Sequence, residues 1–277
     1  MIRDYVRSMI RPMIGDIVGG DTSSYIITID TTKTGTTASN QYRLPVFGTY
    51  DVDWGDGNSS IGVVDPQIHT YSSGGTYQIT VSNTFNYVRH LTSGNDPAKM
   101  VSIDQWGSAQ ITNLNQAYLN CVNMDILASD IPNTSNVTSM FFSWQNCSSL
   151  TSFPLIDTSN VTSMTSTWQN CSSLTSFPLI DTSNVENSSL TFFACTGLTS
   201  FPLIDLSSMT FASNMFGGCT LNTTDWSNLL IQTETLNHNN SVTWSGGNSL
   251  HNAAGQTAIN DLVANHGWVI TDGGLEP

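Results

Sequence analysis

A repeat of 24 residues constrains this chain more than any other feature of its sequence. The segment CSSLTSFPLIDTSNV occurs at residues 147–161 and again, unchanged, at 171–185, and a third copy, CTGLTSFPLIDLSSM, begins at residue 195. An earlier, divergent unit ends at Cys121. Repeats of about this length with recurring leucine are typical of solenoids, in which each unit buries its apolar side only against its neighbours. The sequence therefore predicts a stacked repeat domain over residues 96–220.

The apolar residues of one unit predict a short strand over residues 150–156 whose apolar side faces inward. Pro154 lies within it and cannot donate to a ladder, so the strand must be short or bent. Asp157 follows, and aspartate at this point indicates a turn or a helix N-cap. Further inward positions repeat with the same period: Val137, Val161, Val185, Met140, Met164, Trp144, Trp168, Phe192 and Phe216.

The five cysteines occupy one equivalent position in each unit. They are Cys121, Cys147, Cys171, Cys195 and Cys219. A metal site or disulfides would be the alternative, but metal-binding cysteines usually come in close pairs and no such pair occurs in this sequence. The spacing favours a stacked column of small buried thiols. We expect no metal and no cofactor.

Residues 21–95 alternate between apolar and polar side chains, as β-strands do. Residues 25–29, 49–54 and 76–81 are the clearest examples, and Gly55-Asp56-Gly57-Asn58 reads as a turn. About seven short strands with turn signals between them favour a β-sandwich.

The same region resembles the polycystic-kidney-disease (PKD) type of domain. The resemblance rests on DVDWGDG at 51–57, HTY at 69–71 and GTYQITV at 75–81. It implies an immunoglobulin-like sandwich that serves as a spacer or binding module, with Trp54 and Tyr77 in its core. Asp56 and Gly57 would then hold the turn.

Most of residues 100–277 resemble the BspA-like leucine-rich-repeat surface proteins. The resemblance rests on the repeated N-V-T-x-M and aromatic-x-x-C-x-x-L pattern, on SIDQWG at 102–107 and on HGWVITDGG at 266–274. It implies surface display and adhesion without shared catalytic residues, and members of this family occur in bacteria, protists and phages. The expected fold is thus mainly β with short helical segments: a PKD-like sandwich, a leucine-rich-type solenoid and a C-terminal cap over residues 221–277.

The cap is also expected on physical grounds, because the open end of a solenoid exposes core residues. Gly267 is a suitable helix stop, and Trp268, Val269 and Ile270 can add a last strand. The apolar face of the preceding helix would consist of Ala254, Ala258, Ile259, Leu262 and Val263.

Residues 1–20 predict an anchor peptide that docks on a partner protein, since large apolar residues at a terminus usually find a partner. A frayed leader and a membrane-surface helix are the alternatives. The segment does not match a secretory signal, because arginines interrupt its apolar stretch. The anchor candidates are Ile2, Arg3, Arg7, Ile10, Arg11 and Met13.

The distribution of charged residues limits the kinds of partner that the chain can bind. Only 10% of the residues are charged, and the net charge is −14. All seven Lys and Arg residues lie within the first 99 positions, whereas twelve Asp and Glu residues follow residue 100. A repeat domain without basic side chains repels phosphate, so we expect no nucleic acid as a partner. No apolar run is long enough to span a membrane.

The sequence holds no common catalytic motif, so we expect no enzyme activity. His69 belongs to the PKD-like pattern and is expected to be structural. Asp51, Asp53 and Asp56 could bind Ca²⁺, but their context favours a solvated strand face and a turn. Rows of Ser, Thr and Asn could bind carbohydrate, although solubilising ladders and turns are the favoured interpretation.

These features predict a phage virion protein: a fibre, spike or capsid decoration subunit. The N-terminal segment would dock on other virion proteins, and the acidic repeats would contact a glycan or protein of the host surface. A bacterial cell-surface or extracellular adhesin is the alternative. A polysaccharide-degrading enzyme is a third, since paired carboxylates could lie in a solenoid groove. Homo-oligomer formation is left open.

Overall fold

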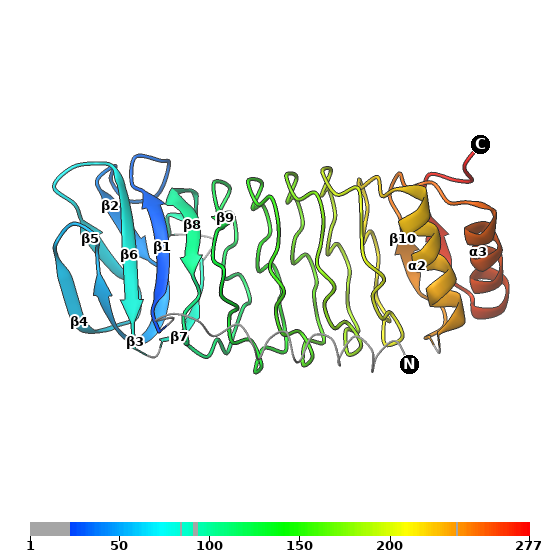
Figure 1. Cartoon of the computed structure of the whole chain (residues 1–277), viewed down its shortest axis with the longest axis horizontal. Helices are drawn as coiled ribbons and strands as arrows, with labels where there is room; N and C mark the ends of the chain where they lie inside the picture. Colours follow the sequence, from blue (N-terminus) through cyan, green and yellow to red (C-terminus); the bar gives the residue numbers. More distant parts are fainter. Residues whose placement is uncertain (1–22, 84, 91–93, 237) are drawn as a thin grey trace.

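The structure is a computed structural model that describes residues 23–83, 85–90, 94–236 and 238–277. The described part is mainly β, with two α-helices and mixed sheets. Figure 1 shows an elongated molecule in which the N-terminal strands, a series of stacked turns and the two helices follow one another along the long axis. No helix in these ranges combines the length and apolar character needed to cross a membrane.

Two sheets form the N-terminal part. In the larger sheet, β3 pairs with β4, β6 and β7, and β1 pairs with β6 and β8, all antiparallel. A separate antiparallel pair joins β2 to β5. The bounds are β1 (Tyr25–Asp30), β2 (Gln41–Leu44), β3 (Val46–Asp53), β4 (Ser59–Val64), β5 (Gln67–Thr70), β6 (Thr76–Ser82), β7 (Phe85–Val88) and β8 (Met100–Gln105).

Alternation along these strands builds the core. Ile27 and Ile29 of β1 are buried, and so are Tyr42 and Leu44 of β2, so both sheets contribute apolar side chains. The strands predicted at 25–29, 49–54 and 76–81 are confirmed. A short 3₁₀ helix, η1 (Pro97–Lys99), precedes β8.

Strand β8 joins the N-terminal part to the repeats. It pairs antiparallel with β1 and parallel with β9 (Asp125–Ile126), so one sheet continues from the first part into the second. After β8, the backbone amides of Trp106 and Gly107 donate to the carboxylate of Asp130 at 3.0 and 2.8 Å. Gly107 has a φ of 73°, and a Cβ there would meet the main chain of Ser24 at 2.6 Å. A glycine is therefore required where the chain turns into the repeats.

The repeat stack (residues 106–220) consists of turns that hydrogen-bond to the next turn along the axis. The amide of Met140 donates to the carbonyl oxygen of Ser163 at 2.9 Å, and that of Met164 donates to Asn187 at 2.8 Å. Isolated parallel bridges connect Ser139 to Ser163, Ser163 to Asn187 and Asn187 to Phe211. Each turn thus supplies the hydrogen-bonding template for its neighbour.

The strand predicted over residues 150–156 is wrong. No strand forms there or at the equivalent residues of the next two repeats, and the parallel bridges lie at Ser139 and its equivalents instead. The physical reason is Pro154 and its equivalents, because proline has no backbone N–H to donate. The stacked turns place these prolines at the same position in every repeat, so no ladder of hydrogen bonds can form there. Leu155 is only partly buried, and its equivalent Leu203 is 43% exposed.

The aspartates after this segment act as turn formers and not as helix N-caps. Asp157 accepts a hydrogen bond from the amide of Ser159 at 3.0 Å, and Asp205 accepts one from Ser207 at 2.9 Å. Such Asx turns let the chain change direction without beginning a helix. No helix follows these residues within the repeat stack.

Two columns of aromatic rings fill the repeat stack. Trp168 lies parallel to Trp144 and Phe192, with ring centroids 5.9 and 5.2 Å apart. Phe177 meets Trp168 edge-on at 4.7 Å, and it stacks on Phe153 at 5.6 Å. The repeated sequence therefore produces a repeated core, in which each ring packs against its own equivalents as well as against the other column.

All five cysteines are free and buried, as predicted. The thiol of Cys171 donates to the carbonyl oxygen of Trp144 at 3.2 Å, and that of Cys195 donates to Trp168 at 3.0 Å. Burial raises the pKa of each thiol, and that of Cys219 reaches about 12. The column is therefore neutral at physiological pH and fills space between successive turns.

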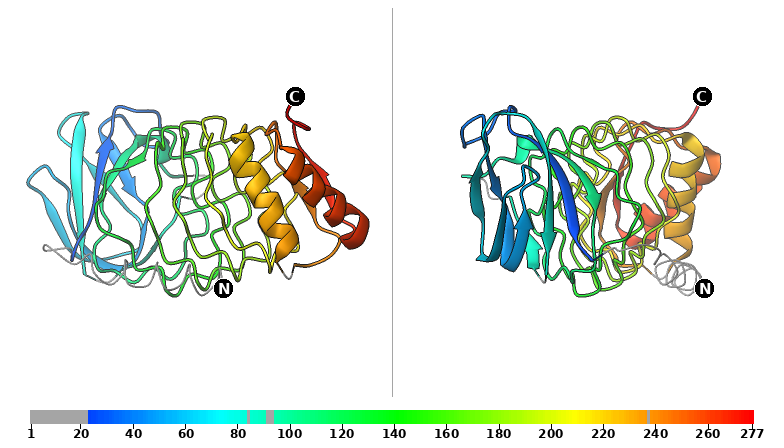
Figure 2. Two further views of the ribbon diagram at one scale, coloured as in Figure 1. Left: turned by 45° about the vertical axis from the view of Figure 1, so that its right-hand side comes forward. Right: turned by 60° about the vertical axis from the view of Figure 1, so that its left-hand side comes forward.

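Two helix–strand units close the C-terminal end of the stack: α2 (Thr223–Thr235) with β10 (Thr243–Ser245), and α3 (Ala253–His266) with β11 (Val269–Thr271). Figure 2 shows the two helices lying side by side at this end. Asn222 and Asn252 cap the helices, and Gly267, with a φ of 67°, ends α3. The predicted final helix, glycine stop and last strand are confirmed.

One detail of the cap differs from the prediction. On α3, Ala258 and Leu262 are buried, but Ala254 and Val263 are exposed. The reason is that α3 is the last helix, so only one side of it has a neighbour.

Candidate functional site

Three regions of the described chain hold polar groups close enough together to suggest chemistry. Each of them has a structural role.

The first region is the turn at Trp54–Gly57. His69 stacks on the ring of Trp54, with centroids 4.6 Å apart, and its Nε2 lies 2.9 Å from Oδ2 of Asp56. Burial is the largest influence on the pKa of Asp56 and acts to raise it. Hydrogen bonds from His69 and Asn58 outweigh burial, so the pKa is lowered. His69 therefore orients the turn, which agrees with the structural role that the sequence predicted for it.

The possible calcium ligands engage separate partners. Asp51 accepts hydrogen bonds from the amide of Gly62 at 2.7 Å and from the side chain of Asn83 at 2.6 Å. Asp53 accepts one from the amide of Gly55 at 2.9 Å. Within the described ranges, no group of three or more His, Cys, Asp or Glu side chains could hold a metal ion. These three carboxylates accordingly stabilise β3 and the turn that follows it.

The second region is a buried charged pair, Asp96 and Lys99, which sequence reasoning missed. Asp96 accepts hydrogen bonds from the amides of Thr36, Thr37 and Arg43 at 2.8–3.0 Å. Lys99 donates to the carbonyl oxygens of Ala38 and Gln41 at 2.8 and 2.9 Å. Both side chains have 0% exposure. The pair ties the loop before β2 to the segment that enters β8.

Opposing influences set the ionisation of this pair. Burial acts to raise the pKa of Asp96, but hydrogen bonds from Thr37 and Arg43 and the charge of Lys99 together lower it. Burial lowers the pKa of Lys99, against the attraction of Asp96. Each charge thus depends on the other and on surrounding main-chain groups, which is typical of a structural clamp.

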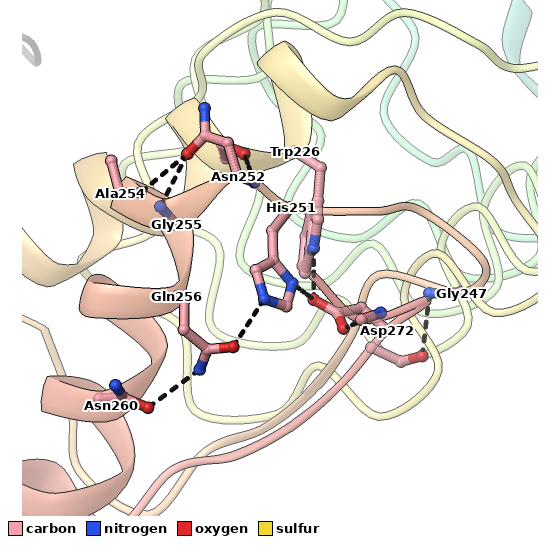
Figure 3. A network of polar contacts seen from close by, with 12 residues as sticks. Trp226, Gly247, His251, Asn252, Ala254, Gly255, Gln256, Asn260 and Asp272 are labelled. Carbon is pink, nitrogen blue, oxygen red and sulfur yellow. Dashed lines mark hydrogen bonds and ion pairs between the residues drawn. The ribbon is translucent and has the colours of Figure 1, made fainter. Parts of the chain in front are cut away.

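The third region is a His–Asp pair in the cap, shown in Figure 3. His251 Nδ1 lies 2.8 Å from Oδ2 of Asp272, and its Nε2 lies 2.9 Å from Oε1 of Gln256. The indole of Trp226 and the amide of Gly274 donate to Asp272 at 2.8 and 2.9 Å. Both ring nitrogens therefore have partners, and none of these partners is a hydroxyl or thiol nucleophile. The network ties α2, α3 and the segment after β11 together.

The Ser and Thr rows of the repeats divide into two kinds. Inward rows are structural: the hydroxyls of Thr134, Thr158 and Thr182 donate to the carbonyl oxygens of Asp157, Asp181 and Asp205 at 2.6–2.7 Å. These hydroxyls form a buried ladder, whereas the sequence favoured a solubilising one. Other rows reach the surface, and they form the candidate functional site.

This surface, the bridge face, lies on the outward side of the parallel bridges. It consists of two columns: Ser139, Ser163, Asn187 and Phe211, and then Phe141, Thr165, Ser189 and Ser213. The residue between the two columns is buried in each turn: Met140, Met164, Ser188 and Ala212. Exposure therefore alternates over these three positions of each turn, which places both columns on one side.

The bridge face is hydroxyl- and amide-rich between two exposed aromatic residues. Phe141 is 38% exposed and Phe211 is 61% exposed. Phe211 occupies the position of Ser139 three repeats later. Sequence reasoning missed both residues, although each is an apolar substitution in a column that is otherwise polar, and that signal was available.

The anchor candidates Ile2, Arg3, Arg7, Ile10, Arg11 and Met13 lie outside the described residues. Their role stays a prediction.

Comparisons with known proteins identify one family. A family model described as "Mycoplasma protein of unknown function, DUF285" matches residues 86–200 and 112–229. Together the two matches cover the repeat stack, its junction with the N-terminal part and the beginning of α2, which is more than half of the chain. Comparisons with curated proteins and with solved structures gave no match.

Proposed function

Since the chain belongs to the family of Mycoplasma proteins of unknown function called DUF285, which supplies no activity, we propose its function from its structure. The chain is a non-catalytic surface-display protein of a phage virion. Residues 1–20 attach it to other virion proteins, and the repeat stack contacts the host surface. In this proposal the two-sheet N-terminal part is a PKD-like spacer, and the stack is a leucine-rich-type solenoid of the BspA-like kind.

The observation that carries this proposal is the continuous sheet from β1 through β8 to β9. A spacer that shares main-chain hydrogen bonds with the repeats holds them in a fixed direction, whereas a flexible linker would not. Display of a binding face at a distance from an attachment point requires such stiffness. The absence of basic side chains after Lys99 further supports a partner other than nucleic acid.

A bacterial cell-surface adhesin is the second candidate. The observation that favours it is the family description itself, which names Mycoplasma, a cellular organism. Both candidates use the repeat stack for binding, and they differ in what the N-terminal segment attaches to.

Co-sedimentation separates the two candidates. Full-length protein and a variant lacking residues 1–20 are mixed with virions stripped of the protein, and with intact bacterial cells. Attachment of only the full-length protein to virions, at a fixed copy number, supports the virion proposal. If neither form attaches to virions while both bind cells, the adhesin takes its place. Release of reducing sugar from host glycans by either form would contradict the non-catalytic part of the proposal.

A further inference from the structure

We propose that the bridge face binds a neutral, linear polysaccharide along the axis of the repeat stack, with Phe141 and Phe211 each packing against the face of a sugar ring. The inference rests on the proposed display function and specifies the ligand of the displayed surface.

The two phenylalanines are placed as a pair of platforms. Phe211 continues the bridge column of Ser139, Ser163 and Asn187. Phe141 lies two residues after Ser139, and the residue between them is buried. The ring of Phe142 packs on that of Phe141, with centroids 3.8 Å apart, which restricts the orientation of the exposed ring. A ring restricted in this way loses little conformational entropy when a ligand covers it.

The distance between the platforms suits an extended sugar chain. Three repeats separate the two positions, so they are about 14 Å apart along the axis at the usual spacing of strands. The length of one sugar in an extended chain is close to one such spacing. A linear chain lying along the axis would therefore bring a sugar unit opposite each repeat.

Polar groups lie between the platforms at this same period. Ser163 and Asn187 are partly exposed, and so are Thr165 and Ser189 in the neighbouring column. Hydroxyl and amide groups both donate and accept hydrogen bonds, as sugar hydroxyls do. A surface with apolar platforms and a few placed polar groups is the usual composition of a small-molecule site.

The charge of the surface favours a neutral polymer over an acidic one. No Lys or Arg follows Lys99 in the chain, and the exposed side chain of Glu186 adjoins Asn187. A chain of uronic or sialic acids would meet like charges without a cation to compensate them. A neutral chain meets no such repulsion.

Affinity electrophoresis of the full-length protein tests the proposal. The gels contain neutral polymers (dextran, α-mannan, galactan and hydroxyethyl cellulose) or the acidic polymers polygalacturonate and hyaluronate. We expect at least one neutral polymer to slow migration, and the acidic polymers to have no effect. In the Phe141→Ala/Phe211→Ala double variant, the dissociation constant should rise by roughly tenfold, the combined loss of two ring contacts.

Two control variants separate loss of the two rings from general apolar binding and from misfolding. Leu203→Ala removes an exposed apolar side chain of the same stack from outside the bridge face and should leave binding unchanged. Phe141→Tyr/Phe211→Tyr keeps both rings and should retain binding, which separates ring loss from misfolding. Binding by the alanine double variant at the parent level, stronger binding of the acidic polymers, or no retardation by any neutral polymer would overturn the proposal.

The display function can be tested with the same variants. If the alanine double variant still co-sediments with virions but binds the polymer roughly tenfold more weakly, both proposals stand. If the parent protein attaches to virions and binds none of the neutral polymers, the ligand is wrong while the display function survives. Polymer binding without attachment to virions would remove the virion proposal alone.

Discussion

The N-terminal part and the repeat stack hold themselves together in opposite ways. The N-terminal part depends on contacts that occur once, such as the buried pair Asp96–Lys99 and the stacked rings of Trp54 and His69. The repeat stack contains no basic residue and no histidine, and its contacts recur with the period of the sequence. A single substitution should therefore remove an irreplaceable contact in the first region and one member of a series in the second.

The largest expected effect comes from breaking the buried pair. Asp96→Ala removes the acceptor of the amides of Thr36, Thr37 and Arg43. It also removes the negative charge that attracts the buried Lys99. Removing one partner of a buried ion pair typically costs about 3–5 kcal/mol. Chemical denaturation should show this loss in the free energy of unfolding.

The control for this variant is Asp65→Asn, which changes an exposed carboxylate at a left-handed position that Asn tolerates. Its effect should be small. A loss below about 1 kcal/mol in Asp96→Ala would show that the clamp is dispensable.

Acid should weaken the junction before it weakens the stack. Burial lowers the pKa of His90 to about 4, and its ring contacts the carbonyl oxygen of Ala117 at 2.6 Å. In the unfolded chain the imidazole of His90 is protonated near pH 6.5. The unfolded state therefore binds more protons than the native state between pH 6.5 and 4. Stability is therefore complete above this window and is lost as pH falls through it, by up to about 3 kcal/mol.

Unfolding at pH 7 and pH 5 should show about 2 kcal/mol of this loss. His90→Phe should flatten the dependence over this window, because the variant has no group to protonate at that position. An unchanged slope in the variant would assign the acid sensitivity to other groups.

A smaller effect should come from repairing the repeat. The side chain of Asn170 donates to that of Asn146 at 2.7 Å, and both residues have left-handed φ values. The equivalent residue in the next turn is Ala194, with a φ of 58°, which is strained for alanine. Ala194→Asn should relieve the strain and extend the amide ladder, stabilising the protein by about 1 kcal/mol.

Ala194→Gly separates the two contributions, since it relieves the strain without adding an amide. Thermal unfolding of both variants against the parent measures them. Destabilisation by both substitutions would mean that Ala194 packs better than its backbone angle suggests.

The smallest expected effect is on cysteine labelling, because the thiols should not react in the native protein. Burial keeps the five thiols protonated, and the pKa of Cys219 is raised to about 12, so a thiol reagent at pH 8 should label none of them in the native protein. All five should react after denaturation. Rapid labelling of one cysteine in the native state would locate a repeat that opens locally.

Local and periodic features could be predicted before the structure was known. The buried cysteine column, the aspartate turns and the Gly267 helix stop each depend on residues close in the chain or on exact repetition. A repeated residue must occupy a repeated environment, so one interpretation extends to every copy. The predicted strand over residues 150–156 failed because its proline was treated as a bend, although stacking repeats the missing donor at every level.

Features that arise from residues far apart in the chain could not be predicted. Asp96 meets Thr37 across 59 positions and His251 meets Asp272 across 21, and nothing in the intervening sequence marks either contact. The same applies to the bridge face. Periodicity specified that each turn would stack on the next, but the side of the turn that carries the parallel bridges decided which rows face solvent. Phe141 and Phe211 are 70 positions apart in the sequence. They belong to one surface only because the repeats between them stack on one another.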